Sequence, residues 1–310
     1  AYEEEDAERL GLAVVEMPEC PVPYSEEEIE IWQDRLSELE ANMMVSDEDE
    51  GDDDAYASML TRITDPAEMA RIHEAWDAPA DQRIIAANAG AGGSEIVVFG
   101  KHTQRLSPAS WLFDEVINVY MFLLQERDDE LRRQDPTRKP SHFFNSYFFE
   151  KMFEPDGRNR YDYSQIKRWS RKIKSTTPKG DVFELDKMFI PVNISNSHWT
   201  LAVAFVKEKK FVYYDSMGGS GRDYIAGLKQ YFKDEAKAKG KANWETIVDD
   251  WEVVLGSRNT PQQSNGSDCG VFTSTTANYL AQDLELRFSS LDADNFRRRM
   301  TLELLELQLL

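Results

Sequence analysis

The sequence predicts an α+β protein in which helices surround a central mixed sheet of about four or five strands. Three apolar runs, rich in β-branched and aromatic residues, follow one another between residues 187 and 216 with only short polar breaks, as neighbouring strands do. A further run at Trp251–Leu255 predicts a fourth strand, and Glu95–Phe99 predicts a short one. The run Val271–Leu280 has apolar residues at helical spacing and predicts the central helix.

Several other segments carry apolar residues at spacings of three and four, which predicts helices around this sheet. These helices are expected over Asp65–Ala87, Trp111–Gln125, Ser146–Phe153, Tyr163–Ile173, Arg222–Ala238 and Asp292–Leu310. The charged, proline-flanked stretch Asp128–Pro140 predicts an exposed loop. The adjacent Arg297, Arg298 and Arg299 predict a solvated face on the last helix.

Acidic residues are concentrated in the first quarter of the chain. Residues 1–80 hold 25 of the 57 acidic and 4 of the 36 basic side chains, so 32 of each remain for residues 81–310. This partition indicates an appended segment of different character. We predict an acidic N-terminal extension over residues 1–64 and a main domain over residues 65–310.

Within the extension, an apolar stripe from Ile29 to Met43 predicts one amphipathic helix, which could dock on the main domain or on a partner. The like-charged run Ser46–Asp54 predicts a disordered linker. The acidic residues could also attract basic partners.

Composition excludes several classes of protein. No apolar run is long enough to span a bilayer, no secretory signal is visible, and the two cysteines, Cys20 and Cys269, are too few for a disulfide framework. We therefore expect a protein of a reducing intracellular compartment, the nucleus or the cytoplasm. Neither a metal-ligand spacing nor a dinucleotide fingerprint is present, so no cofactor is expected. The neutral main domain does not suggest nucleic-acid binding.

One thiol stands where a polar, glycine-bearing turn runs into the predicted central helix. Cys269 follows the turn Pro261–Asp268, and the helix N-terminus would favour its thiolate form. A cysteine chosen at random is more often a buried small hydrophobe. The polar turn, however, suggests an exposed thiol, and therefore a candidate nucleophile.

A base and its orienting group are available upstream. His198 begins the second of the three predicted strands and Asp215 ends the third. If these strands are antiparallel neighbours, the imidazole and the carboxylate meet at one edge of the sheet. A thiol nucleophile needs such a base, and the base needs an acceptor on its other nitrogen. His73, His102 and His142 lie in stretches without this arrangement, and surface or helix-capping roles are expected for them.

The order of these motifs resembles the ubiquitin-like-protein-specific proteases, the SUMO (sentrin) deconjugating cysteine peptidases. The resemblance rests on His198-Trp199, Asp215-Ser216, Gln263 and Asp268-Cys269-Gly270, and it extends upstream to Leu106–Asn118 and Phe144–Phe149. It covers roughly residues 75 to 310. It implies a papain-like cysteine protease fold with the nucleophile at the N-terminus of the central helix.

The resemblance also implies the roles of individual residues. Cys269 would be the nucleophile, His198 the general base, Asp215 its orienting group and Gln263 the oxyanion-hole side chain. Trp111 and Trp199 would enclose the Gly-Gly tail of the substrate, and Asp114 would contribute to substrate binding. Core packing is the ordinary alternative for the two tryptophans. Phe113 departs from the family pattern, which usually has asparagine at this position.

The expected function is hydrolysis of the peptide or isopeptide bond after the C-terminal Gly-Gly of a ubiquitin-like modifier. SUMO is the first expectation, in precursor maturation, in deconjugation from target lysines or in both. The partners would be SUMO or a related modifier and its conjugates, and the enzyme is expected to be a monomer. One alternative keeps the enzyme and changes the modifier. A second is a catalytically silent modifier-binding scaffold, and a third is an acyltransferase on the same thiol scaffold.

Overall fold

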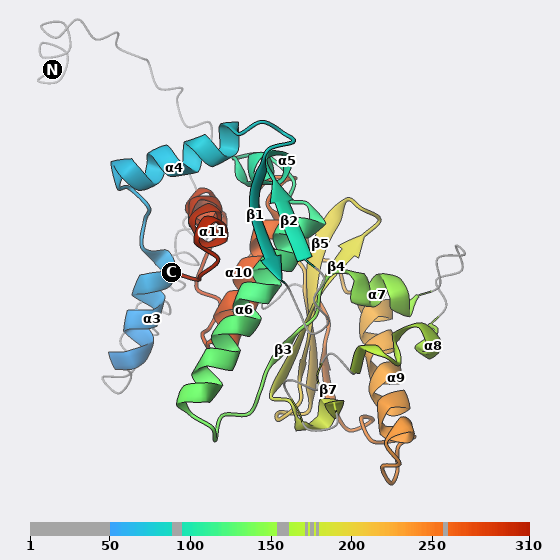
Figure 1. Cartoon of the computed structure of the whole chain (residues 1–310). Coiled ribbons are helices and arrows are strands. Elements are labelled where there is room, and N and C mark those ends of the chain that lie inside the picture. Colours follow the sequence, from blue (N-terminus) through green and yellow to red (C-terminus); the bar gives the residue numbers. More distant parts are fainter. Residues whose placement is uncertain are drawn as a thin grey trace, which may run out of the picture. The chain divides into compact units, whose positions relative to one another are not determined.

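A computed structural model describes residues 50–88, 95–153, 161–170, 173, 177, 180–256 and 260–310 (Figure 1). The chain divides into two compact units, Ala1–Asp53 and Asp54–Leu310, and the description below concerns the second. The helix expected over residues 25–43 lies outside the described residues. Helix α3 (Glu50–Leu60) begins inside the acidic run that was predicted as a linker. Its residues Tyr56 and Met59 belong to the main apolar core, which explains the difference from the predicted boundary at residue 65.

A five-stranded mixed sheet with the order β3-β4-β5-β6-β7 forms the centre of the second unit. The strands are β3 (His142–Phe143), β4 (Lys187–Ile194), β5 (His198–Phe205), β6 (Lys210–Tyr214) and β7 (Glu252–Val254). The three central strands are antiparallel to one another, and each outer strand pairs parallel with its neighbour. The predicted mixed sheet and its run of three adjacent strands are confirmed.

Both faces of this sheet are buried. On β5, Leu201 and Val203 belong to one apolar cluster, and Ala202 and Ala204 between them belong to the other. This alternation is the period-2 geometry of a strand, and helices cover each face in turn. The first cluster includes residues of α6 (Asp114–Gln134), α10 (Cys269–Ala281) and α11 (Ala293–Glu306). The second includes residues of α7 (Tyr147–Met152), α8 (Tyr163–Ile166) and α9 (Arg222–Ala238).

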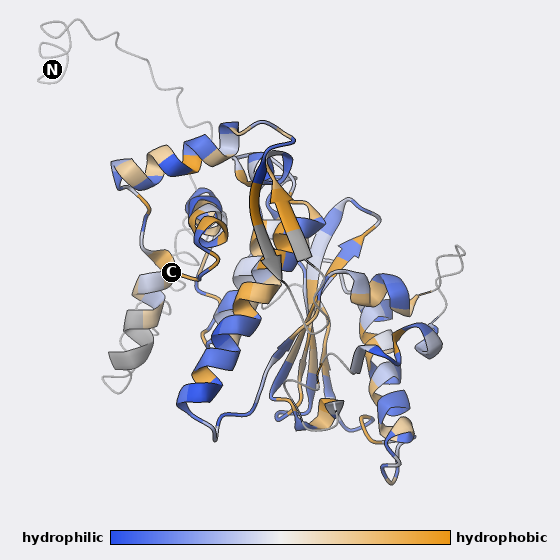
Figure 2. Ribbon diagram, viewed as in Figure 1, coloured by the Kyte–Doolittle hydropathy of each residue, from blue (hydrophilic) through white to orange (hydrophobic). Residues whose placement is uncertain are grey.

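Several of the predicted helices end elsewhere than expected; α8, for example, ends at Ile166 and not at Ile173. Helix α6 continues to Gln134, so the expectation of a loop from Asp128 is wrong for its first seven residues. Figure 2 shows the last turns of α6 mostly in hydrophilic colours, and such a charged segment resembles a loop in the sequence. The helix expected over Asp65–Ala87 ends early: α4 covers Pro66–Asp77, and Arg83–Asn88 is strand β1.

Strand β1 pairs antiparallel with β2 (Glu95–Phe99) in a separate two-stranded sheet. The periodicity of residues 65–87 alone could not show that the end of this range pairs with another strand. The short helix α5 (Gly100–Thr103) and the 3₁₀ turn Gln104–Leu106 follow directly and lead into the loop before α6. Within the described residues, no helix combines the length and the apolarity that crossing a bilayer requires.

Candidate active site

His198 and Asp215 meet at one edge of the sheet. Strands β5 and β6 are antiparallel with Leu201 opposite Tyr214, so the first residue of β5 lies close to the residue that follows β6. The predicted pairing of these strands is therefore confirmed. His198 Nε2 lies 2.7 Å from Asp215 Oδ1, and Asp215 is 3% exposed. A short contact between an imidazole and a buried carboxylate orients the ring and stabilises its protonated form.

Backbone N–H groups of the turn after β6 bind the Asp215 carboxylate. The backbone N–H of Met217 donates to Oδ1 at 2.7 Å, and the backbone N–H of Gly219 also donates to the carboxylate. Burial by itself would raise the pKa of Asp215, but the hydrogen bonds from His198 and from these two backbone groups hold it below its usual value. The carboxylate is therefore charged and held in one orientation.

Gly219→Ala is expected to reduce activity by about 10²-fold, because displacing a group of the active site by about 1 Å can cost that much. A Cβ atom at Gly219 would lie 2.3 Å from Asp215 Oδ2, so the carboxylate must move. The measurement is kcat/KM on a modifier substrate alongside the melting temperature. In an Asp215→Asn background the same alanine should add little. Equal losses in both backgrounds would contradict this link to Asp215.

Cys269 is the first residue of α10, which packs against β5. The expectation of an exposed thiol is wrong, since Cys269 is 2% exposed, although it lines a cavity. The next residue explains the close packing: a Cβ atom at Gly270 would lie 2.9 Å from Leu112 Cβ, so glycine lets α10 approach the loop before α6. The Cys269 thiol is thus almost covered, and it lines the cavity.

The thiol and the imidazole influence each other. Hydrogen bonding to Asp215 and to Cys269 raises the pKa of His198 to about 9, although burial acts in the opposite direction. His198 Nδ1 is buried and makes no direct hydrogen bond that satisfies the usual geometry. In enzymes without bound substrate, the hydrogen bond between a base and its nucleophile is often long, and it shortens once substrate is bound. The site therefore favours an imidazolium beside the sulfur.

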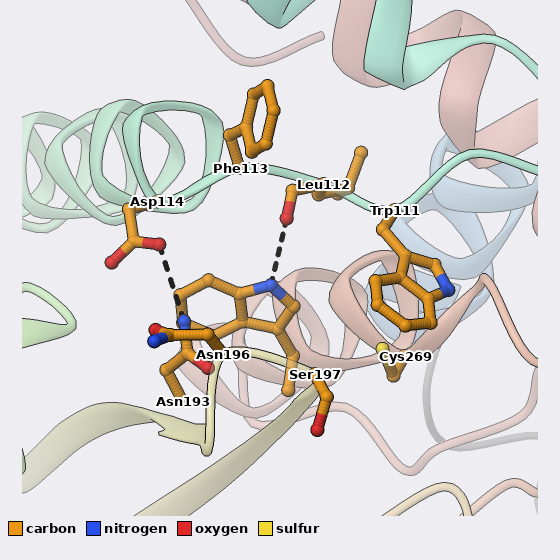
Figure 3. A pocket seen from close by; sticks show the side chains of 9 residues that line it. Trp111, Leu112, Phe113, Asp114, Asn193, Asn196, Ser197 and Cys269 are labelled. Atoms are coloured by element: carbon orange, nitrogen blue, oxygen red, sulfur yellow. Dashed lines mark hydrogen bonds between the residues drawn. The ribbon is translucent and has the colours of Figure 1, made fainter.

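The two tryptophans differ in their surroundings. Trp199 is 5% exposed and its Nε1 donates to the Leu112 carbonyl oxygen at 2.9 Å, whereas Trp111 is 49% exposed and its Nε1 donates to the Gly266 carbonyl oxygen at 2.6 Å. Both indoles and Cys269 line a cavity of about 280 Å³, which Figure 3 shows from close by. Core packing accounts for Trp199 but not for Trp111, because half of the latter's surface remains accessible.

Asp114 and Phe113 lie on the rim of the same cavity. Burial raises the pKa of Asp114, and its carboxylate accepts hydrogen bonds from Ser146 Oγ at 3.0 Å and from Asn193 Nδ2 at 3.3 Å. Phe113 is 37% exposed, and the Arg105 guanidinium lies 4.9 Å from the centre of its ring. Phe113 is therefore accessible on this rim, whereas the Asp114 carboxylate is held by its two neighbours.

Gln263 lies beside the end of β6. Its backbone N–H donates to the Ser216 carbonyl oxygen at 3.0 Å, and its side-chain Nε2 donates to the Asn265 carbonyl oxygen at 2.6 Å. The loop that carries Gln263 leads directly into Cys269. Of the four predicted catalytic residues, His198 at the start of β5, Asp215 just after β6 and Cys269 at the start of α10 lie together. Gln263 is hydrogen-bonded to Ser216, the residue after Asp215.

The histidines outside this site are not all at the surface. His102 is buried, with its Nε2 3.6 Å from Glu115 Oε1, and His142 is buried on β3. The expected capping role is found for His102, whose Nδ1 accepts the Phe99 backbone N–H at the start of α5 at 3.2 Å, but the expectation of a surface or capping role is wrong for His142. Each is packed by aromatic neighbours, His102 by Phe113 and His142 by Phe144, which sequence spacing did not indicate.

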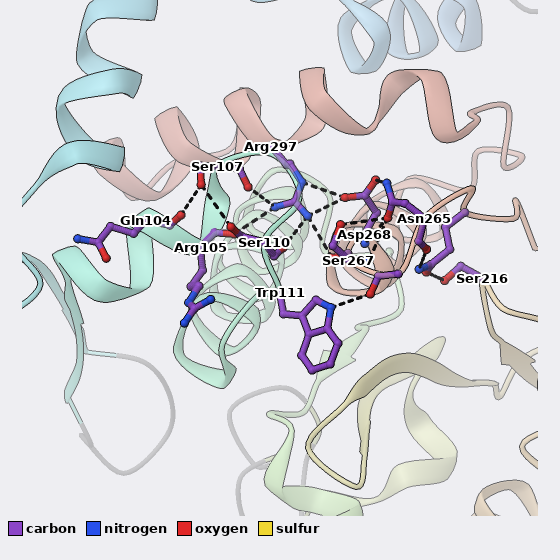
Figure 4. A network of polar contacts seen from close by, with 12 residues as sticks. Gln104, Arg105, Ser107, Ser110, Trp111, Ser216, Asn265, Ser267, Asp268 and Arg297 are labelled. Atoms are coloured by element: carbon purple, nitrogen blue, oxygen red, sulfur yellow. Dashed lines mark hydrogen bonds and ion pairs between the residues drawn. The ribbon is translucent and has the colours of Figure 1, made fainter.

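A buried arginine joins the two loops that flank the site, a role that the sequence did not indicate. Arg297 is completely buried and Arg299 is 3% exposed, so the predicted solvated face is wrong for both. The Arg297 guanidinium contacts Asp268 Oδ1 at 2.6 Å and donates to the carbonyl oxygens of Ser107 and Ser110 at 2.9 and 2.7 Å (Figure 4). The fork geometry of arginine suits several acceptors at once. Arg297 thereby links the segment before Trp111 to the residue before Cys269.

Arg297→Met is expected to destabilise the protein by about 3–5 kcal/mol, because it leaves the buried Asp268 carboxylate without its cation. Arg71→Met provides the matched control. Arg71 forms a surface ion pair with Glu306 at 2.9 Å with both side chains nearly half exposed, so its loss should cost about 1 kcal/mol or less. Urea unfolding of both variants measures the difference. Similar losses for the two would contradict the structural role of Arg297.

The chemistry available to this arrangement is acyl transfer through a thiol. It contains a thiol at a helix N-terminus, an imidazole held by a buried carboxylate, and a side-chain amide in the loop that leads to the thiol. Among the described residues, no group of three or more histidine, cysteine, aspartate or glutamate side chains is placed to hold a metal ion.

Known proteins share this sequence and fold. Residues 110–308 match the model of the Ulp1 protease family, C-terminal catalytic domain. Ubiquitin-like-specific protease 1A of Arabidopsis thaliana is 35% identical over 215 residues, which are 69% of this chain and 40% of that protein. Sentrin-specific protease 2 of Homo sapiens is 33% identical over 208 residues, which are 67% of this chain and 32% of that protein. The chain therefore spans less than half of the length of these two relatives.

A solved structure shows the same fold. The C-terminal Ulp1 protease domain, in complex with the yeast SUMO ortholog Smt3, superposes with a TM-score of 0.62 and 23% identity, covering 80% of this chain and 98% of that domain. A Ulp1-like SUMO protease catalytic domain from Chaetomium thermophilum superposes with a TM-score of 0.58 and 21% identity over 80% of this chain and 91% of that one. At these identities the likeness establishes the architecture.

Proposed function

Because this chain belongs to the Ulp1 protease family, we propose that it is a cysteine peptidase that cleaves after the C-terminal Gly-Gly of a ubiquitin-like modifier. One observation carries the proposal: the His198–Asp215 pair at the sheet edge adjoins Cys269, which opens into a cavity between two tryptophans. A silent binding scaffold would not need an imidazole held 2.7 Å from a buried carboxylate beside a thiol.

In the proposed reaction, His198 already holds the proton from Cys269, and the sulfur attacks as the thiolate on the carbonyl carbon of the terminal glycine. The charge on the carbonyl oxygen is received by the Gln263 side-chain amide and the Cys269 backbone N–H. Protonated His198 then donates its proton to the departing amine, and a thioester remains. Water attacks the thioester, its proton passes to His198, and the free carboxyl group and the thiol are released. Asp215 keeps the imidazole in the required orientation.

The cavity supports selection for a diglycine tail. Its volume of about 280 Å³ lies at the small end for ligand sites, and the indoles of Trp111 and Trp199 line it. Two glycines bring no side chains, so they can pass where a bulkier residue would collide with a ring. Asp114 and Phe113 on the rim are the proposed contacts for the folded part of the modifier.

SUMO is the modifier that the relatives favour. The human relative is named a sentrin-specific protease, and the superposed Ulp1 domain was solved with a SUMO ortholog. The deciding experiment is a panel of ubiquitin-like modifiers carrying a C-terminal fluorophore. Turnover of SUMO with little turnover of ubiquitin supports the proposal, and preference for another modifier would replace SUMO. Failure to cleave any member, together with no labelling of Cys269 by a Gly-Gly propargyl probe, would favour a silent scaffold.

Activity is expected to fall as pH rises through about 9, the pKa of His198. A raised pKa keeps the imidazole protonated at neutral pH, and this proton must be given to the departing amine. Above the pKa the proton is lost, and the rate declines. A kcat/KM profile from pH 6 to 10, with circular dichroism at each pH, tests this, and a limb near pH 7 without unfolding would contradict it.

A further inference from the structure

Ser216 follows Asp215 directly, and its side chain points to a different catalytic group. Ser216 is 4% exposed and lies just beyond the end of β6. Its carbonyl oxygen accepts a hydrogen bond from the Gln263 backbone N–H at 3.0 Å, and the Asp215 carbonyl oxygen accepts one from Gln262 Nε2 at 3.1 Å. These bonds join the end of β6 to the loop that leads into Cys269.

The side-chain amide of Gln263 is held at both ends. Ser216 Oγ donates to Gln263 Oε1 at 2.6 Å, and Gln263 Nε2 donates to the Asn265 carbonyl oxygen at 2.6 Å (Figure 4). The amide nitrogen carries two N–H groups. One is used by Asn265, and the other remains available for a substrate oxygen.

This arrangement matters because the two ends of an amide have opposite electrostatic character. If the Gln263 amide rotated by half a turn, its oxygen would face the charge that develops on the substrate carbonyl and would repel it. We propose that Ser216 is a positioning residue that holds the Gln263 amide with its N–H group directed at the oxyanion. This inference rests on the proposed function, since it assigns the support of the oxyanion-binding group.

The direct test is Ser216→Ala, assayed on a modifier carrying a C-terminal fluorophore. Loss of one short hydrogen bond is expected to lower kcat about tenfold, with a small change in KM. The rate at which iodoacetamide alkylates Cys269, followed by mass spectrometry of its peptide, should stay within twofold. Alkylation uses the thiol and its base but develops no oxyanion.

A double-mutant cycle separates an effect through Gln263 from a general one. Gln263→Ala alone should lower kcat by about 10²–10³-fold. If Ser216 acts through Gln263, adding Ser216→Ala in that background should cost less than twofold. Thr200→Val is the matched control. It removes another buried hydroxyl that makes a 2.6 Å side-chain hydrogen bond, here to Tyr213 between β5 and β6. This control should keep the wild-type kcat.

Three results would overturn the proposal: an unchanged kcat in Ser216→Ala, an equal loss in the Gln263→Ala background, or a parallel loss in the alkylation rate. Melting temperatures are measured for every variant, and Ser216→Thr, which keeps the hydroxyl, should retain activity within about threefold. If Ser216→Ala does not fold, a Ser216→Thr variant that folds and loses activity as Gln263→Ala does would also overturn it. Failure of the proposed function is distinguishable, since the wild-type protein would then not turn over the substrate.

Discussion

Cys269→Ser is expected to abolish turnover, with a loss on the order of 10⁶-fold in kcat, while modifier binding remains intact. The substitution replaces sulfur with a smaller oxygen at a position that is 2% exposed and lines the cavity. The cavity therefore keeps its shape. A serine hydroxyl remains protonated beside His198, because its acidity is far weaker than that of a thiol. Cleavage is followed on a gel, and binding by isothermal titration with the intact modifier.

The chain contains a second cysteine that serves as the control. Cys20→Ser removes the other thiol and should leave turnover at the wild-type level. Cleavage at the normal rate by Cys269→Ser, or its loss in Cys20→Ser, would show that Cys269 is not the nucleophile.

Asp215→Asn is the second large effect, with an expected loss of about 10⁴-fold in kcat and little change in the melting temperature. The carboxylate accepts hydrogen bonds from the His198 ring and from the backbone N–H groups of Met217 and Gly219. An asparagine must turn its NH₂ group toward one of these donors, so it cannot satisfy all of them. The imidazole then loses both its orientation and the partner that most raises its pKa.

The pH profile provides the readout that a structural defect would not change. In Asp215→Asn the alkaline limb of kcat/KM should move from about pH 9 to lower pH, because the pKa of His198 falls when the hydrogen bond to the carboxylate is lost. A variant with reduced activity but an unmoved limb would mean that Asp215 acts in some other way. Thermal unfolding of the same samples shows whether the fold is retained.

Several elements could be predicted from the sequence because their signals are local. The runs that became β4, β5 and β6 are apolar, β-branched and divided by short polar turns, and α9 covers the predicted range. The meeting of His198 and Asp215 followed from antiparallel pairing alone. Other elements depended on contacts with other segments. For this reason β1 was predicted as helix, and the charged end of α6 from Asp128 was predicted as loop.

The sequence by itself determined the chemistry of this protein: which thiol, imidazole, carboxylate and amide are present, and in what order along the chain. Only the tertiary structure decided what surrounds them. Three adjacent arginines look alike in the sequence, yet Arg297 is buried against Asp268 and the loop before Trp111, Arg299 is buried beside Glu303, and Arg298 is only half-buried. Burial and the direction of a side chain depend on which segments pack together, and residues almost two hundred positions apart share the contact between Arg297 and that loop.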